Sequence, residues 1–514
     1  MGSPMSDPPG EKHLVLACIE DSVRAVTVRV LGAYAESLGV RTTLLLIVKP
    51  PATVGHPLTF APREVRQIAA FLRREQATHF GMYLMTATLK PYRLLVAALR
   101  EAGFTGVIMA GGVHASLCPE ESLVEGADFA VHGPGELPLK MLFEGIDPAT
   151  IPGLVWRKEG AVVVNAQSPE QRVDLDTLPF PLFRFGRDKV LVHGKLRSYT
   201  WRLHQRLTEW GGRFYDLITS RGCPYKCAYC CRVDRGAIRR ASVDRVIAEL
   251  KHLREHHPKI AGVNIQDDAF FYGPEDWVRE FCRRMKAEVG LPFIVRMIPR
   301  FVTPERIELL KDGGLDYVTM GFEGSDRLNH TLYKRPEDKE SFLKAARAVL
   351  DAGLYLSLDL LVDNPYETEA DLREMAQTLN ALPRPNWGVV SLSLTPFPGT
   401  PLYERAVKDK KLDCFATDAY DAMLMPSRPG AYSTPRFWRL LLTQLLPVIG
   451  PALAGPLIAA GPKDPEAAQT VERLAKWTAR MTRLTAFLRD HVPFLYRFLV
   501  RRQQRLGKSA ARPK

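Results

Sequence analysis

The sequence predicts an α/β protein with two consecutive domains, followed by a helical region that is basic and apolar. Two stretches, 12–150 and 213–404, alternate short apolar strands with amphipathic helices, the pattern of βα units that share a mainly parallel sheet. Between them, 151–212 lacks this alternation and is rich in turn residues. The chain of 514 residues is also too long for a single core, so two or three domains are expected. The remainder, 405–514, forms the predicted helical region.

The first domain is predicted to be doubly wound and Rossmann-like, with helices on both faces of its sheet. Ligands of such sheets bind beyond the carboxyl ends of the strands, where glycines let the backbone approach a flat ligand closely. The expected strands cover 13–19, 42–48, 80–85, 107–110 and 129–132. The candidate ligand contacts follow these strands: Met85, Thr86, Gly111, Gly112, His114, Gly133 and Glu136.

The connector, 151–212, is a linker in composition and is expected to cross from one domain to the other. It contains one short β-like run at 161–164. A proline on each side of Phe180 excludes a helix interior at that point.

The second domain is predicted to be a partial (β/α)6 barrel, because six strands alternate with helices along it. The chemistry of such barrels lies at the carboxyl ends of the strands. A loop with three cysteines follows the first strand, 216–219, after the turn residue Gly222. Cys223, Cys227 and Cys230 are spaced C-x3-C-x2-C.

Thiolates are soft ligands that suit iron–sulfur clusters and zinc. Both an all-cysteine cluster and a structural zinc site need four ligands, so three cysteines leave one metal corner open for a substrate or cofactor. The alternative is a zinc knuckle with the adjacent Cys231 as fourth ligand. Neighbouring residues rarely aim at one tetrahedral ion, so Cys231 is interpreted as a loop residue.

The cysteine loop resembles that of the radical SAM superfamily. The resemblance implies that Cys223, Cys227 and Cys230 hold a 4Fe-4S cluster whose open iron chelates S-adenosyl-L-methionine (SAM), with Tyr229 near the adenine. Three further segments resemble the superfamily in order and spacing. They are Asp267-Asp268 after the second strand, the run from Gly321 through Glu323 and Ser325 after the fourth, and Asp363-Asn-Pro-Tyr-Glu-Thr after the fifth. The first implies contacts near the SAM amino group, and a carboxylate such as Glu323 suits a ribose or an ammonium group.

The first domain resembles the cobalamin-binding domain of one large radical SAM subfamily. Matching elements are Gly111-Gly-Val-His114, Pro119-Glu-Glu and Gly133-Pro-Gly-Glu136. The sequence departs from the Asp-x-His-x-x-Gly element after the first strand, where Cys18-Ile-Glu-Asp-Ser stands, so no protein histidine is expected on cobalt. The alternative is a Rossmann-like domain used only for packing. His114 and His132 are taken as structural residues rather than cobalt ligands, although the Gly111–His114 turn should contact the cofactor.

The resemblance implies an enzyme, most simply a methyltransferase that acts on an unactivated carbon through a 5′-deoxyadenosyl radical and methylcobalamin. A cyclase or rearrangement enzyme without methyl transfer is a close alternative, and a non-catalytic cobalamin or iron–sulfur sensor is an alternative of another class. The expected partners are a small-molecule or lipid-like substrate and a reductant such as flavodoxin or ferredoxin.

The cysteine content indicates the cellular compartment of the protein, and the net charge is concentrated in one part of the chain. The eight cysteines show no disulfide pattern and the first residues do not resemble a signal peptide, so a reducing cytoplasm is expected. Of the net charge of +13, +11 lies in 435–514, which has 15 Lys/Arg and 4 Asp/Glu.

This tail also contains 440–460, an uncharged apolar run, followed by basic amphipathic sequence from 471 to 500. The pattern favours peripheral membrane contact, while a helical cap on the barrel is an equal alternative. Nucleic-acid binding is not expected, because the tail is apolar and no base-stacking module is evident.

Overall fold

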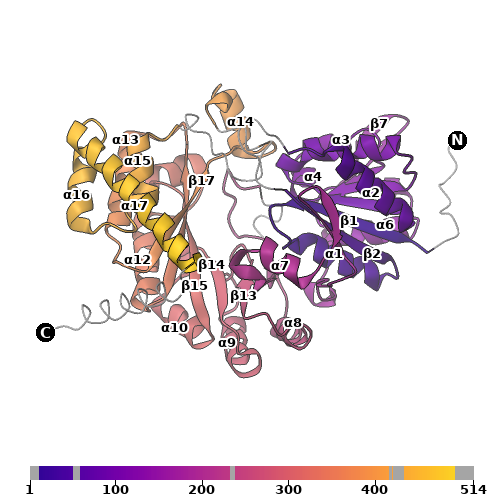
Figure 1. Cartoon of the computed structure of the whole chain (residues 1–514), viewed down its shortest axis with the longest axis horizontal. Helices are drawn as coiled ribbons and strands as arrows, with labels where there is room; N and C mark the ends of the chain where they lie inside the picture. The colour runs from indigo at the N-terminus through magenta and orange to yellow at the C-terminus, as the bar shows by residue number, and fades with distance from the viewer. Residues whose placement is uncertain (1–10, 50–57, 232–237, 416–419, 421–432, 492–514) are drawn as a thin grey trace.

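The computed structural model describes residues 11–49, 58–231, 238–415, 420 and 433–491, with the backbone alone for 484–491. Two α/β domains lie side by side, and the C-terminal helices pack on the barrel at the end away from the N-terminal domain (Figure 1). The predicted fold class is confirmed: a doubly wound domain precedes a parallel β/α domain.

The N-terminal domain contains a nine-stranded sheet in the order β7-β6-β5-β4-β3-β1-β2-β8-β9. β1 is buried on both faces, which explains its continuous apolar sequence. The chain order reverses between β1 and β3, the position at which doubly wound sheets bind ligands. The strands are β1 (His13–Glu20), β2 (Arg41–Val48), β3 (His79–Tyr83), β4 (Val107–Gly111), β5 (Phe129–Val131), β6 (Leu154–Lys158), β7 (Ala161–Val164), β8 (Lys189–Val192) and β9 (Lys195–Ser198).

Helices cover both faces of this sheet, and each face has its own core. Ile68 of α2 and Tyr92 of α3 pack on one face. Val28 of α1 and Leu139 of α6 pack on the other. The helices are α1 (Val26–Ser37), α2 (Pro62–Arg74), α3 (Leu89–Glu101), α4 (Val113–Leu117), α5 (Pro119–Ser122) and α6 (Glu136–Phe143).

The connector is more than a linker: besides the β-like run expected at 161–164, which forms β7, it contributes three further strands to the first sheet. β6 pairs antiparallel with β5, and β7 with β6, so they extend one edge of the first sheet. β8 pairs parallel with β2, and β9 pairs with β8, so they extend the other edge. Both edges of the doubly wound sheet are thereby covered by connector strands.

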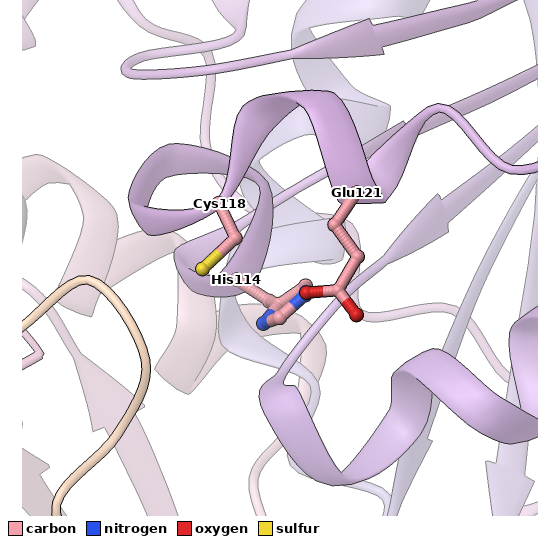
Figure 2. A group of neighbouring side chains, drawn as sticks. All are labelled: His114, Cys118 and Glu121. Carbon is pink, nitrogen blue, oxygen red and sulfur yellow. The ribbon is translucent and has the colours of Figure 1, made fainter. Parts of the chain in front are cut away.

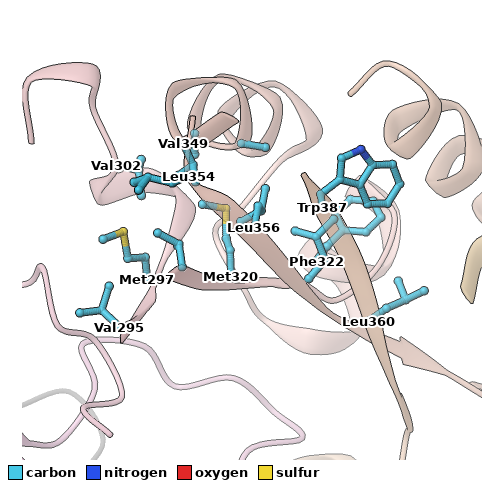
Figure 3. Close-up of a cluster of buried hydrophobic side chains, with 14 of the residues drawn as sticks. Val295, Met297, Val302, Met320, Phe322, Val349, Leu354, Leu356, Leu360 and Trp387 are labelled. Atoms are coloured by element: carbon cyan, nitrogen blue, oxygen red, sulfur yellow. The ribbon is translucent and has the colours of Figure 1, made fainter. Parts of the chain in front are cut away.

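The second domain is a six-stranded, all-parallel sheet in chain order, as predicted. Alternate side chains pack against the outer helices in one continuous core, where Figure 3 shows Val295, Met320 and Leu356 together. The strands are β10 (Phe214–Leu217), β13 (Gly262–Ile265), β14 (Phe293–Met297), β15 (Leu315–Phe322), β16 (Tyr355–Val362) and β17 (Trp387–Ser393). The helices are α8 (Val243–His256), α9 (Glu275–Arg284), α10 (Pro304–Asp312), α12 (Lys339–Asp351), α13 (Glu369–Asn380) and α14 (Pro401–Lys408).

The C-terminal region caps the barrel, so the helical-cap alternative describes the apolar run correctly. This run belongs to α15 (Arg436–Leu440), a single π-turn at Leu441–Leu445 and α16 (Pro451–Ala460), with α17 (Pro465–His491) after it. Leu441, Leu445 and Leu457 lie in the barrel core. α16 packs against α13. In the part of the chain that the structure describes, no helix has the length and hydrophobicity needed to cross a bilayer.

Candidate functional site

The cysteine loop leaves the first barrel strand through a short antiparallel pair, β11 (Ser220–Arg221) with β12 (Arg239–Arg240). Gly222 has φ of 106°, which a residue with a side chain would adopt only under strain. The N–H of Cys230 donates to the carbonyl of Cys227 at 3.1 Å. Besides burial, the proximity of Cys230 raises the pKa of the Cys223 and Cys227 thiols. The three predicted ligands therefore lie together at the barrel mouth.

Two long-range backbone bonds hold this loop in place. The N–H of Ala228 donates to the carbonyl of Tyr333 at 2.7 Å, and the N–H of Leu402 on α14 donates to the carbonyl of Ala228 at 3.0 Å. Burial raises the pKa of the Cys223 and Cys227 thiols, so a metal is needed to hold them as thiolates at neutral pH.

Among the described side chains, the loop cysteines do not form a ligand group as compact as a zinc site requires. Zinc binds sulfur at about 2.3 Å, so its ligand atoms must lie close to one another. Among the described side chains, the one group of three or more His, Cys, Asp or Glu ligand atoms within 4.8 Å of one another is His114, Cys118 and Glu121. The four cysteines of the loop do not form such a group, which is compatible with a larger cluster.

Arg335 is a residue of this site that the sequence interpretation missed. Its guanidinium is 4.0 Å from the Cys227 sulfur and 3.6 Å from the carboxylate of Glu323. Burial raises the pKa of Glu323. Tyr229 packs edge-on to Tyr333, at 5.2 Å between ring centroids. The sequence contains only a weak signal for Arg335. It is a basic residue that precedes a proline and follows the single π-turn Asn329–Tyr333.

Asp267 has a different role from the predicted contact with the SAM amino group. Its buried carboxylate accepts hydrogen bonds from the N–H groups of Thr219 and Ser220 at 2.7 and 3.0 Å, and from both hydroxyls. Arg240 lies 3.5 Å away. A carboxylate offers about four acceptor positions, so Asp267 has none left for a ligand and instead fixes the start of the cysteine loop. Its neighbour Asp268 faces the cavity between the domains.

Ser325 is also a structural residue rather than a ligand contact. Its hydroxyl donates to the carboxylate of Asp371 at 2.6 Å and accepts from the N–H of Leu328 at 3.3 Å. It thereby caps the short helix α11 (Asp326–Leu328). Glu323, whose side chain is 13% exposed, is the residue of this segment that lies next to the cysteine loop, through Arg335.

A cavity of about 300 Å³ lies between the two domains. Gly111, Gly112, Gly133 and Glu136 line it, whereas Met85, Thr86 and His114 do not. Geometry requires a glycine at Gly112, because its φ is 111° and a Cβ there would lie 2.6 Å from the Tyr83 ring. The deeper wall is mainly apolar and comes from both sheet and helices: Leu16, Val28, Leu31, Met109, Val131 and Leu139.

The barrel contributes the opposite wall of the same cavity, through Arg221, Gly222, Gln266 and Asp268. The cavity therefore reaches from the strand ends of the first domain to the residues beside Cys223. A flat, largely apolar ligand bound by the first domain would lie next to the cysteine loop.

Hydrogen bonds hold His132 in place, as expected of a structural residue. The ring nitrogens of His132 contact the carbonyl of Asn165 at 2.8 Å and the amide of Gln167 at 2.9 Å. Among the described residues, no histidine lines the cavity.

Comparisons with known proteins identify both domains. The model of the radical SAM superfamily matches residues 217–379, and that of the B12 binding domain matches residues 12–143. The chain belongs to the radical SAM superfamily. It is a radical SAM enzyme with a cobalamin-binding domain ahead of the barrel, as the motifs indicated. Its cofactors are a 4Fe-4S cluster, SAM and cobalamin.

Two curated proteins are similar to this radical SAM enzyme. An uncharacterized methyltransferase of Pyrococcus horikoshii is 24% identical over 416 residues, which cover 78% of this chain and 83% of that protein. Cytidylyl-2-hydroxyethylphosphonate methyltransferase of Streptomyces wedmorensis is 27% identical over 273 residues. That alignment spans 46% of this chain and 49% of that enzyme, so the chain matches about half the length of this relative.

Solved structures share the two-domain fold. TsrM from Kitasatospora setae, a radical SAM methyltransferase with cobalamin and the iron–sulfur cluster bound, has a TM-score of 0.61 at 19% identity. The match covers 86% of this chain and 84% of TsrM. The cobalamin-dependent enzyme OxsB has a TM-score of 0.56 at 17% identity, with 78% of this chain and 56% of OxsB covered.

Proposed function

We propose that this radical SAM enzyme transfers a methyl group to an unactivated carbon of a small polar molecule. The observation that carries the proposal is the shared cavity, because Gly111 and Gly133 of the cobalamin-binding domain face Gly222 and Asp268 of the barrel across it. When bound, the cluster and SAM supply a 5′-deoxyadenosyl radical for hydrogen abstraction, and cobalamin supplies a methyl group.

The protein residues orient these groups. We propose that Cys223, Cys227 and Cys230 ligate the cluster, and that Arg335 places a positive charge beside the Cys227 sulfur. Asp267 fixes the backbone of Thr219 and Ser220, so the loop geometry is set before any ligand binds. Tyr229, Asp268 and Glu323 are the residues we propose for SAM, and Gly111, Gly112, Gly133 and Glu136 those for cobalamin.

A polar inner wall of the barrel supports a polar substrate. Tyr215 and Leu217 face the outer core, so Asp216, which alternates with them, faces inward. The carboxylate of Asp216 accepts hydrogen bonds from the side-chain amides of Asn264 at 2.9 Å and Gln266 at 2.6 Å. An apolar substrate would leave these polar groups poorly solvated. This wall therefore argues against the lipid-like substrate that was expected as an alternative to a small molecule.

Asp359 is the clearest candidate for a substrate contact on this wall. It lies on the inward face of β16, between Gly321 and Val390 in the strand register. Burial raises its pKa. Within the described residues, its carboxylate has no hydrogen bond or ion pair, although the charge of Arg296 acts on it. We propose that it receives an amino or hydroxyl group of the substrate.

Reconstitution of the protein with its cofactors in the absence of oxygen distinguishes the proposed enzyme from a non-catalytic sensor. The full chain would be loaded with cluster and cobalamin, reduced with flavodoxin or dithionite, and supplied with SAM. Formation of methionine and 5′-deoxyadenosine in the presence of a polar cell extract is expected. A loaded protein that binds SAM but never consumes it would contradict the proposed activity and favour a sensor.

We also propose a cytoplasmic location, with the peripheral membrane contact resting on α17 alone. The apolar run 440–460 packs on the barrel, so most of its large apolar side chains are not exposed for contact with a membrane. α17 still exposes Trp477 (58%) and Met481 (40%), and the basic residues Lys476 and Arg480 lie next to them in the helix. Flotation of the full chain with anionic vesicles, and its loss in Trp477→Ala, is expected. Equal flotation of both proteins would contradict the contact. The sequence beyond 491, with its further arginines, lies outside the described residues.

A further inference from the structure

Three metal-binding side chains converge on one corner of the cobalamin-binding domain. His114 and Cys118 are separated by four positions and Glu121 follows three later, across the junction of α4 and α5. Their ligand atoms all lie within 4.8 Å of one another. Figure 2 shows the three side chains pointing toward one another from this corner. None of them lines the cavity between the domains.

The ring of His114 is buried and held in a fixed orientation, with one nitrogen left over. Its side chain is 1% exposed. Nδ1 lies 3.2 Å from the hydroxyl of Thr86, while Nε2 has no hydrogen-bond partner and points to the carboxylate of Glu121 at 3.6 Å. Burial lowers the pKa of His114. A buried nitrogen without a hydrogen-bond partner destabilises the fold unless a ligand satisfies it.

We propose that His114 Nε2, Cys118 Sγ and the Glu121 carboxylate bind a divalent transition-metal ion, with zinc as the best match. Nitrogen, thiolate sulfur and carboxylate oxygen are the three ligand types that zinc takes, and a water would complete the tetrahedron. With the ion on Nε2, Nδ1 carries the proton and donates to the Thr86 hydroxyl, which fixes the orientation of the ring. Binding replaces the thiol proton: the S–H bond of Cys118 breaks, a metal–sulfur bond forms, and the proton goes to solvent.

The position of the site gives the ion a structural role. Val113 and Ser116, on the same short helix, line the cavity between the domains. The other side of this helix touches the barrel. The carbonyl oxygen of Leu117 lies so close to the loop at Gly399 that a Cβ on Gly399 would be 2.7 Å from that oxygen. A helix of five residues has little stability of its own. An ion bridging it to α5 would hold one wall of the cavity against the barrel.

The test uses the complete protein, loaded with cluster and cobalamin without oxygen and given one equivalent of zinc. X-ray absorption at the zinc edge is blind to iron and cobalt. The expected spectrum contains one sulfur at about 2.3 Å and two or three nitrogen or oxygen neighbours. Cys118→Ser should remove the sulfur signal. Glu121→Gln, at a half-exposed position, should weaken zinc binding at least tenfold without unfolding the protein.

Matched controls are Cys414→Ser, at an exposed cysteine, and Glu120→Gln, at the neighbouring exposed carboxylate. Both should bind zinc as the parent does. A spectrum with several sulfurs that survives Cys118→Ser would place zinc on the cluster loop and overturn the proposal. So would the absence of tight zinc binding, or equal binding by Glu121→Gln and the parent.

Discussion

Arg221 donates a hydrogen bond to Glu136 at 2.7 Å, which joins the barrel to the cobalamin-binding domain. Arg221 is two residues before Cys223, and Glu136 begins α6. The Glu136 side chain is 5% exposed, and both residues line the cavity. This ion pair ties the entry of the cysteine loop to the rim of the cofactor cavity, so the relative position of the two cofactor sites depends on it.

Glu136→Gln should therefore loosen the two domains and weaken cobalamin retention. The substitution leaves the Arg221 charge without its carboxylate, which costs about 2 kcal/mol for a pair that is not fully buried. Urea unfolding would measure the stability, and gel filtration the cobalamin that remains bound. Glu144→Gln, at an exposed site paired with Lys140, is the control and should change neither. Equal cobalamin retention by all three proteins would contradict the role of the pair.

The cluster ligands make the sharpest prediction about the loop. Cys223→Ala, Cys227→Ala and Cys230→Ala should each lose the cluster, because each removes one of its three thiolates. Cys231→Ala should keep it. Iron content and the visible absorption band of each protein, prepared without oxygen, provide the measurement. Loss of the cluster in Cys231→Ala together with its retention in Cys230→Ala would show that the ligands are wrongly assigned.

Neighbouring aspartates should give opposite results. Asp267→Asn replaces one acceptor oxygen of a buried carboxylate by a donor and should cost about 3 kcal/mol in unfolding free energy. The amount of cluster bound by the Asp267→Asn protein should also fall. Asp268→Asn should leave stability within about 0.5 kcal/mol and weaken SAM binding instead. Calorimetric SAM titration and urea unfolding separate the two effects. A stable Asp267→Asn protein that fails to bind SAM would restore the ligand role first expected for Asp267.

Glu367 predicts a pH dependence of stability. Burial raises its pKa from the usual 4.5 to about 7, and Thr434, just before the C-terminal helices, donates a hydrogen bond to it. The folded state therefore binds more protons, so this contribution is complete below pH 4.5 and disappears as pH rises through about 7.

From about pH 5.5 to about pH 8, the parent should lose about 2 kcal/mol of unfolding free energy relative to Glu367→Gln. Urea unfolding at several pH values measures this difference. Glu340→Gln, at an exposed position of α12, should keep the pH dependence of the parent. Parallel curves for the parent and Glu367→Gln would contradict the raised pKa.

The sequence predicted the parts of the fold that depend on local pattern. The six β/α units and the place of Cys223 after the first barrel strand follow from apolar periodicity and turn residues, which are short-range signals. The partners of β6 and β8 do not, because strands of four or five residues join a sheet edge through contacts far away in the chain. The apolar run in the tail has the same composition whether it covers a barrel or enters a bilayer, so only packing decides between them.

The site shows the same limit at the level of single residues. A motif brings a carboxylate to a strand end but does not say which way it points. Asp267 turns into the protein and is saturated by Thr219 and Ser220, whereas Asp268, one residue later, faces the cavity. Arg335 was missed because it comes 108 positions after the cysteine it contacts. Side-chain direction and long-range approach are properties of the folded chain.

Transfer of the methyl group tests the central claim most directly. The loaded enzyme would be incubated without oxygen with a polar cell extract and SAM whose methyl group carries deuterium. The proposed function predicts a polar product that carries the deuterated methyl on a carbon, detected by mass spectrometry. It should be absent with Cys227→Ala and formed normally with Cys414→Ser. Production of 5′-deoxyadenosine and a new product without deuterium would contradict methyl transfer and favour a cyclase or rearrangement reaction.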